Sequence, residues 1–162
     1  MDVKIFINNM ADLERLGSVL AMSLALVKPY LVCYLKGGLG VGKTALVREI
    51  LKHQGFSGVV VSPSFSIMEV YNFPDFKIVH LDLYRVRHME ELDIIGVTDF
   101  IDNNILFVEW PDVATRYFHA DLIIDFYLHE NIRELNCCSY TLNGNLILRY
   151  VQENLLANEK NI

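Results

Sequence analysis

The stretch LVCYLKGGLGVGKTALVREILKH, from Leu31 to His53, decides the fold of this 162-residue chain. It begins with the apolar run LVCYL, which is typical of a buried strand, and ends with ALVREILKH, a pattern that predicts a helix. Between them lies a glycine-rich turn that ends in Lys-Thr. A strand, such a turn and a helix in this order predict a site that holds phosphate groups.

The turn fits the phosphate-loop pattern G-x-x-x-x-G-K-T in full. Its glycines let backbone N–H groups come close to phosphate oxygens, and the following helix adds its positive N-terminal end. Lys43 is expected to reach the β- and γ-phosphates, and the Thr44 hydroxyl is expected to coordinate Mg²⁺. The predicted nucleotide contacts of the loop are Gly37, Gly38, Leu39, Gly40, Val41, Gly42, Lys43 and Thr44.

A phosphate loop also needs a carboxylate at a strand end to hold the metal, and three candidates occur: Asp82 in IVHLDLYR, Glu109 in ILFVEW and Asp125 in LIIDFYL. Asp125 falls within a predicted hairpin, away from the edge where ligands of parallel sheets collect, so we interpret it as structural. Asp82 and Glu109 are the preferred pair, one anchoring the metal shell and the other binding metal or orienting the attacking water. The predicted catalytic residues are Lys43, Asp82 and Glu109, and the predicted metal ligands are Thr44, Asp82 and Glu109.

Two further features lie near these motifs in the sequence. SPSFSIMEVY (Ser62–Tyr71) offers hydroxyl groups, including Ser62 and Ser64, where a loop that senses the γ-phosphate often lies; an ordinary polar turn is the alternative. Trp110, the only tryptophan, follows Glu109 and either covers the nucleotide or plugs the edge of the sheet. For Trp110, the residues alone favour a side chain that plugs the edge of the sheet. For Ser62 and Ser64, they do not decide between a sensing loop and an ordinary polar turn.

The remaining patterns predict an α/β fold with three layers, a mainly parallel central sheet with antiparallel additions, and helices on both faces. Strands are expected at Val3–Asn8, Leu31–Leu35, Val59–Ser62, Ser66–Tyr71, Lys77–Leu83, Ile105–Glu109, Asp121–His129 and Arg133–Thr141. Helices are expected at Asp12–Leu26, from the phosphate loop to His53, within Glu90–Phe100 and within Asp112–Phe118. Asn143-Gly144 predicts a turn, and Leu146–Leu156 is ambiguous. Residues 1–162 are expected to form one domain, with a flexible or helical tail from about 150.

The composition limits the kinds of partner that this domain is expected to bind directly. The formal net charge is −6 and the basic residues are scattered, which argues against direct binding to DNA or RNA. Lys28-Pro29 splits the longest apolar span into pieces too short to cross a membrane, and the N-terminus lacks a secretion-signal pattern. We therefore expect a cytoplasmic protein that meets any RNA through a partner.

The motifs GGLGVGKT, SPSFSIMEVY, HLDLYR, ELDIIGVTDF and VEWP occur in the order and spacing of the TsaE (YjeE) family, which this chain resembles from about Val3 to Ile124. The resemblance implies a P-loop ATPase that needs ATP and Mg²⁺ and acts with a TsaD–TsaB pair in the threonylcarbamoyladenosine modification of tRNA. ATP binding would promote assembly with that pair, and hydrolysis would reset it. The resemblance also implies that Ser62 and Ser64 lie in a switch-like loop and that Trp110 is part of the nucleotide site.

The sequence departs from the family where GDLGAGKT has become GGLGVGKT, so Gly38 replaces an acidic residue beside the predicted site. Two other functions stay open at this point. One is a small-metabolite or nucleoside kinase, although the arginines after the loop are isolated and no lid-length polar insertion stands out. The other is a nucleotide-gated interaction module with little hydrolysis, which the change at Gly38 keeps open.

Overall fold

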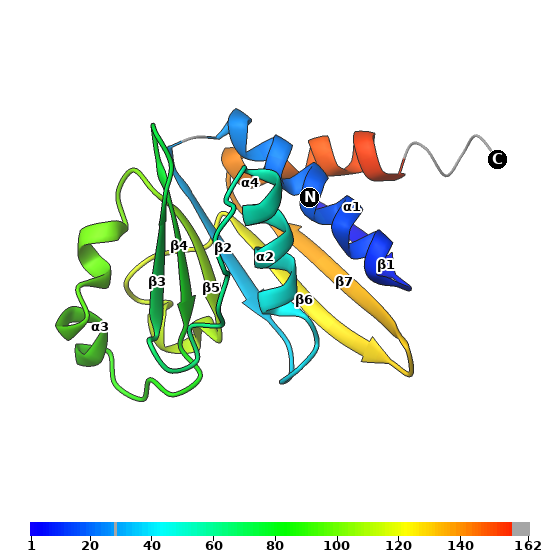
Figure 1. The fold of residues 1–162 in the computed structure, drawn as a ribbon. Coiled ribbons are helices and arrows are strands. Elements are labelled where there is room, and N and C mark those ends of the chain that lie inside the picture. Colours follow the sequence, from blue (N-terminus) through cyan, green and yellow to red (C-terminus); the bar gives the residue numbers. More distant parts are fainter. Residues whose placement is uncertain (28, 157–162) are drawn as a thin grey trace.

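The computed structural model describes residues 1–27 and 29–156, and within them one mixed sheet forms the centre of the molecule (Figure 1). Its strands run in the order β1-β7-β6-β2-β5-β4-β3. The bounds are β1 (Asp2–Ile7), β2 (Leu31–Lys36), β3 (Met68–Asn72), β4 (Lys77–Asp82), β5 (Ile105–Glu109), β6 (Leu122–His129) and β7 (Ile132–Ser139). The pairs β6/β2, β2/β5 and β5/β4 are parallel, and the outer pairs are antiparallel. The predicted parallel core with antiparallel additions is confirmed.

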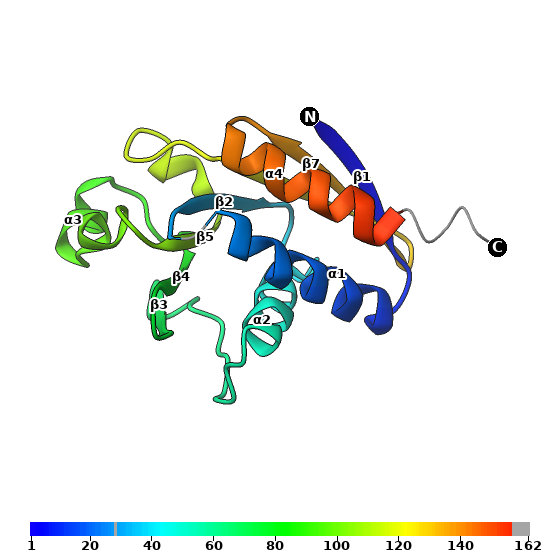
Figure 2. The ribbon, with the colours of Figure 1, turned by 90° about the horizontal axis from the view of Figure 1, so that it is seen from above.

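Helices cover both faces of this sheet, as predicted (Figure 2). One face packs against α1 (Met10–Ser23), η1 (Leu24–Leu26), α2 (Lys43–His53), α4 (Leu142–Val151) and η4 (Gln152–Leu156). The other face packs against the short elements α3 (Glu90–Ile94), η2 (Val97–Phe100) and η3 (Pro111–Ala114), together with the loops around them. Because β2 and β5 lie between these layers, both are continuous apolar runs and not alternating patterns.

The parallel order brings strand ends and the phosphate loop together. The arrowheads of β2 and β4 point to the lower edge of Figure 1, where the loop between β2 and α2 also lies. The register of β4 and β5 places Asp82 directly beside Glu109. Two predicted carboxylates that are 27 positions apart in the chain therefore become neighbours at the edge that carries the loop.

The prediction of a strand at Val59–Ser62 is wrong. These residues are irregular, with the side chain of Val59 85% exposed, and β3 takes the place beside β4 at the edge of the sheet. A strand needs a neighbour for its backbone hydrogen bonds, and the fold leaves none for this apolar run.

The turn predicted at Asn143-Gly144 is also wrong, because both residues lie in α4. Thr141 caps this helix, since its hydroxyl accepts a bond from the Gly144 N–H at 3.3 Å. A Cβ atom at Gly144 would lie 2.0 Å from the carbonyl oxygen of Asp121. The glycine therefore permits close packing of the helix, and the ambiguous segment after it is helical as far as Leu156. Lys28 and residues 157–162, which belong to the predicted break and tail, lie outside the described residues.

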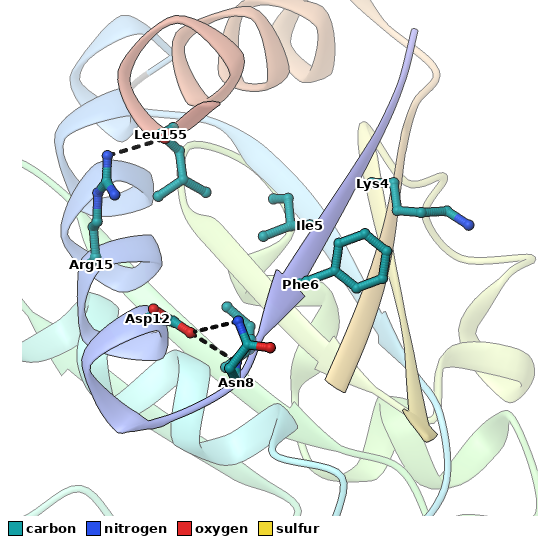
Figure 3. A pocket seen from close by; sticks show the side chains of 8 residues that line it. Lys4, Ile5, Phe6, Asn8, Asp12, Arg15 and Leu155 are labelled. Atoms are coloured by element: carbon teal, nitrogen blue, oxygen red, sulfur yellow. Dashed lines mark hydrogen bonds between the residues drawn. The ribbon is translucent and has the colours of Figure 1, made fainter. Parts of the chain in front are cut away.

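A cavity of about 250 Å³ lies between β1, α1 and η4 (Figure 3). Asn9 caps α1 through a bond from the Asp12 N–H to its side chain, and Asp12 in turn accepts a bond from the Asn8 N–H at 2.8 Å. The Arg15 guanidinium donates to the carbonyl of Leu155 at 3.1 Å, which ties η4 to α1. None of the predicted site residues lines this cavity. Among the described residues, no helix has the length and apolar character that crossing a membrane requires.

Candidate functional site

The phosphate loop joins the end of β2 to the start of α2, and its shape depends on glycine. Gly37 and Gly42 have φ angles of 127° and 112°, in the region that other residues avoid. A Cβ atom at Gly37 would also lie 2.6 Å from the carbonyl oxygen of Phe126. The sequence pattern therefore matches a backbone that only glycine adopts without strain at these two positions.

Lys43, the first residue of α2, lies folded against this loop. Its ammonium group donates to the carbonyls of Gly37 at 2.9 Å and Gly38 at 2.7 Å, and it lies 4.4 Å from the ring centroid of Trp110. Burial lowers the pKa of Lys43, and the carboxylates of Glu109 and Asp82 oppose this shift. The loop therefore encloses a partly desolvated cation, which its carbonyls, the Trp110 ring and the nearby carboxylates stabilise.

Glu109 and Thr44 are in direct polar contact across the site. The Thr44 hydroxyl donates to Oε1 of Glu109 at 2.7 Å, and Nε2 of His80 lies 2.9 Å from the same oxygen. Beside them, Asp82 accepts a bond from the Tyr84 N–H at 3.1 Å. Burial raises the pKa of Asp82, and the Tyr84 N–H partly offsets this shift. Two buried carboxylates and one lysine thus meet at the start of α2.

Trp110 closes one side of the site. Its backbone is left-handed, with φ 56° and ψ 55°, at the point where the chain turns from β5 into η3. This turn places the indole ring above the Lys43 ammonium and 4.9 Å from the ring of Tyr84. A bulky residue in this conformation is uncommon and costs about 1–3 kcal/mol, which fits a functional constraint.

These groups surround a cavity of about 430 Å³, within the size range of small-ligand sites. Its lining is formed by Leu39, Gly40, Gly42, Lys43, Thr44, Ala45, Arg48, Ser62, Ser64, Asp82, Glu109 and Trp110. Of the predicted loop residues, Gly37, Gly38 and Val41 do not line it; the first two contact Lys43 through their carbonyls. Asp125 does not line it either.

Three residues near the site were missed in the sequence. The spacing of Arg48 and His80 could have placed them on the side of the site. Arg48 follows Thr44 by one helical turn, and His80 precedes Asp82 by two strand positions, so each shares a face with a predicted site residue. No sequence spacing indicated Arg133. This residue lies on β7, 92 positions from Val41, and its Nε donates to the Val41 carbonyl at 2.8 Å. Only the order of strands in the sheet brings it to the loop.

The residues at this site fit a magnesium ion held together with a phosphate group. The described residues contain no group of three or more His, Cys, Asp or Glu side chains that could hold a metal alone. Mg²⁺ in phosphate-binding proteins needs less, because phosphate oxygens and water complete its shell. The Thr44 hydroxyl and the Glu109 carboxylate, 2.7 Å apart, supply two hard oxygen donors, and Asp82 lies beside them.

The fold and the arrangement of the loop define the class of P-loop NTPase-like α/β proteins. A solved structure titled crystal structure of Bacillus subtilus YdiB shares this fold, with a TM-score of 0.71 and 23% sequence identity, over 99% of this chain and 97% of that one.

Sequence comparison narrows the class to one family. The model of the threonylcarbamoyl adenosine biosynthesis protein TsaE matches residues 7–135. The tRNA threonylcarbamoyladenosine biosynthesis protein TsaE of Rickettsia felis is 34% identical over 74% of this chain and 68% of its own length. Its namesake from Haemophilus influenzae is 32% identical over 73% and 76%. The chain belongs to the TsaE family, whose members take part in tRNA threonylcarbamoyladenosine biosynthesis.

Proposed function

We propose that this protein is a Mg²⁺-dependent ATPase subunit of the tRNA threonylcarbamoyladenosine machinery. One observation carries the proposal: the Thr44 hydroxyl and the Glu109 carboxylate lie in hydrogen-bond contact beside the buried ammonium of Lys43. A cation, a hydroxyl and a carboxylate at the start of a helix are the groups that phosphoryl transfer from a nucleoside triphosphate requires.

In this mechanism Lys43 and the loop amides bind the β- and γ-phosphates, and Thr44, Glu109 and Asp82 are the residues that would hold Mg²⁺. The metal, when bound, neutralises charge that develops on the phosphates. Glu109 or Asp82 orients the attacking water, and Trp110 covers the phosphate side of the site. Ser62 and Ser64 face the same cavity from the loop before β3, where they can sense whether a γ-phosphate is present.

We further propose that ATP binding favours assembly with a TsaD-like and TsaB-like pair and that hydrolysis resets this assembly. The net charge of −6 and the scattered basic residues favour indirect contact with tRNA, through the complex. Slow hydrolysis by the isolated subunit is expected.

Mixing this protein with a TsaD–TsaB pair tests the proposal. With ATP and Mg²⁺ present, size-exclusion chromatography should show a complex larger than the pair alone, and Lys43→Ala should abolish it. If the wild-type protein fails to co-elute at micromolar concentrations, the partnership is wrong. A nucleoside kinase would instead transfer the phosphate to an added nucleoside, which a screen of acceptors would detect.

A further inference from the structure

His80 is a buried polar residue at the site to which the proposed function gives no role. Its side chain is fully buried on β4. Val79 and Leu81 pack into the core beneath α3, so the alternation of the strand turns His80 and Asp82 to the opposite face, toward α2. His80 therefore lies behind the pair formed by Thr44 and Glu109.

Within the described part of the chain, the ring of His80 makes one hydrogen bond. Nε2 lies 2.9 Å from Oε1 of Glu109, and because an ionised carboxylate only accepts, Nε2 is the donor. Nδ1 is buried and has no hydrogen-bond partner among the described residues. A buried atom left unpaired destabilises a fold, so an aliphatic side chain would suit this position better if stability were its only role.

The carboxylate of Glu109 is held on one side only. Oε1 accepts both the Thr44 hydroxyl and the His80 N–H, whereas Oε2 accepts no bond from any residue in the described ranges. If the Thr44 oxygen bound a metal ion, its bond to Glu109 would be lost or reoriented. The His80 N–H is then the donor that still fixes Oε1.

We propose that His80 is a positioning residue for Glu109, which it orients so that Oε2 faces the metal and water side of the cavity. This inference rests on the proposed function, because it assigns Glu109 to a magnesium site. A donor behind a metal-binding carboxylate typically changes metal affinity or activity by about 10- to 100-fold when it is removed.

The test compares two amides at position 80. In His80→Gln the amide nitrogen reaches about as far as Nε2, whereas in His80→Asn it is one methylene shorter and does not reach Glu109. Calorimetric titration with a non-hydrolysable ATP analogue is repeated over a series of Mg²⁺ concentrations. The series gives the Mg²⁺ concentration at which the affinity for the analogue has reached half of its full metal-dependent gain. We expect this half-maximal Mg²⁺ concentration to rise about tenfold in His80→Asn and to stay near the wild-type value in His80→Gln.

Tyr71→Phe is the matched control, because the Tyr71 hydroxyl is the other buried side-chain atom without a partner in the described part and lies outside the site. It should leave the Mg²⁺ dependence unchanged. If His80→Asn is folded and keeps the wild-type Mg²⁺ dependence, or if both amides lose it equally, the positioning role is wrong. If the wild-type protein itself binds nucleotide without Mg²⁺ dependence, the proposed metal site fails instead.

Discussion

The two sides of the cavity are built in different ways. On one side, Lys43, Thr44 and Glu109 project from the start of α2 and the end of β5, and each has a hydrogen-bond partner. On the other side, Ser62 and Ser64 lie in the irregular segment between α2 and β3, and their hydroxyls bond to no described residue. Phe65, beside them, is 82% exposed. Hydrogen bonds preorganise the strand-end side, whereas no such bond within the described residues fixes the two serine hydroxyls.

Removing the cation from the strand-end side should have the largest effect. Lys43→Ala should weaken ATP binding by about 100-fold, because charge-assisted bonds to phosphate are worth about 1.5–3 kcal/mol each. Isothermal titration calorimetry measures this directly, with Lys36→Ala as the control, since Lys36 precedes the loop and does not line the cavity. Equal affinities for Lys43→Ala and wild type would show that the loop does not bind the phosphates of ATP.

A substitution at Glu109 tests whether the strand-end side takes part in ATP hydrolysis as well as in ATP binding. Glu109→Gln keeps the shape but removes the charge, so hydrolysis should fall about 100-fold while ATP affinity changes by less than tenfold. Phosphate release under saturating ATP measures the rate. Asp125→Asn, a strand carboxylate outside the cavity, should hydrolyse ATP at the wild-type rate. Unchanged turnover in Glu109→Gln would exclude Glu109 from the catalytic residues.

The serine side should give a smaller effect. Ser64→Ala should lower hydrolysis or complex formation by about two- to tenfold, the range of one neutral hydrogen bond. Ser66→Ala is the control, because the Ser66 hydroxyl donates to Glu69 and does not line the cavity. If Ser66→Ala matches Ser64→Ala, the segment contributes only through its folding, and the contrast between the two sides disappears.

The smallest expected effect is on the stability of the nucleotide-free protein, and it concerns Asp82. Burial raises its pKa above the ordinary value of 3.8, so the ionised carboxylate is disfavoured in the folded protein and destabilises it at neutral pH. Without nucleotide, Asp82→Asn should therefore melt slightly above wild type at pH 7. This gain should vanish as the pH falls below 3.8, where Asp82 is protonated in both states. Melting curves across pH measure it, with the exposed Asp112→Asn as control; a lower melting temperature at pH 7 would contradict it.

The same contrast explains what the sequence could predict. Glu109 was found because a buried parallel strand is a continuous apolar run and its end is marked by the first charge. Lys43 and Thr44 were found because the loop needs glycines at fixed positions. In the irregular segment, hydroxyl-bearing residues alone did not distinguish a sensing loop from an ordinary turn, although Ser62 and Ser64 do line the cavity. Its run of valines predicted a strand for which the sheet leaves no place. Arg133 reaches the loop only through strand order, which local patterns do not contain.

A crystal structure with Mg²⁺ and a non-hydrolysable ATP analogue would show where the nucleotide binds. We predict that the β- and γ-phosphates lie in the loop from Gly37 to Thr44, with the metal bound by the Thr44 hydroxyl and Glu109. Nucleotide found elsewhere, for example in the cavity between β1 and α1, with the loop empty, would contradict it.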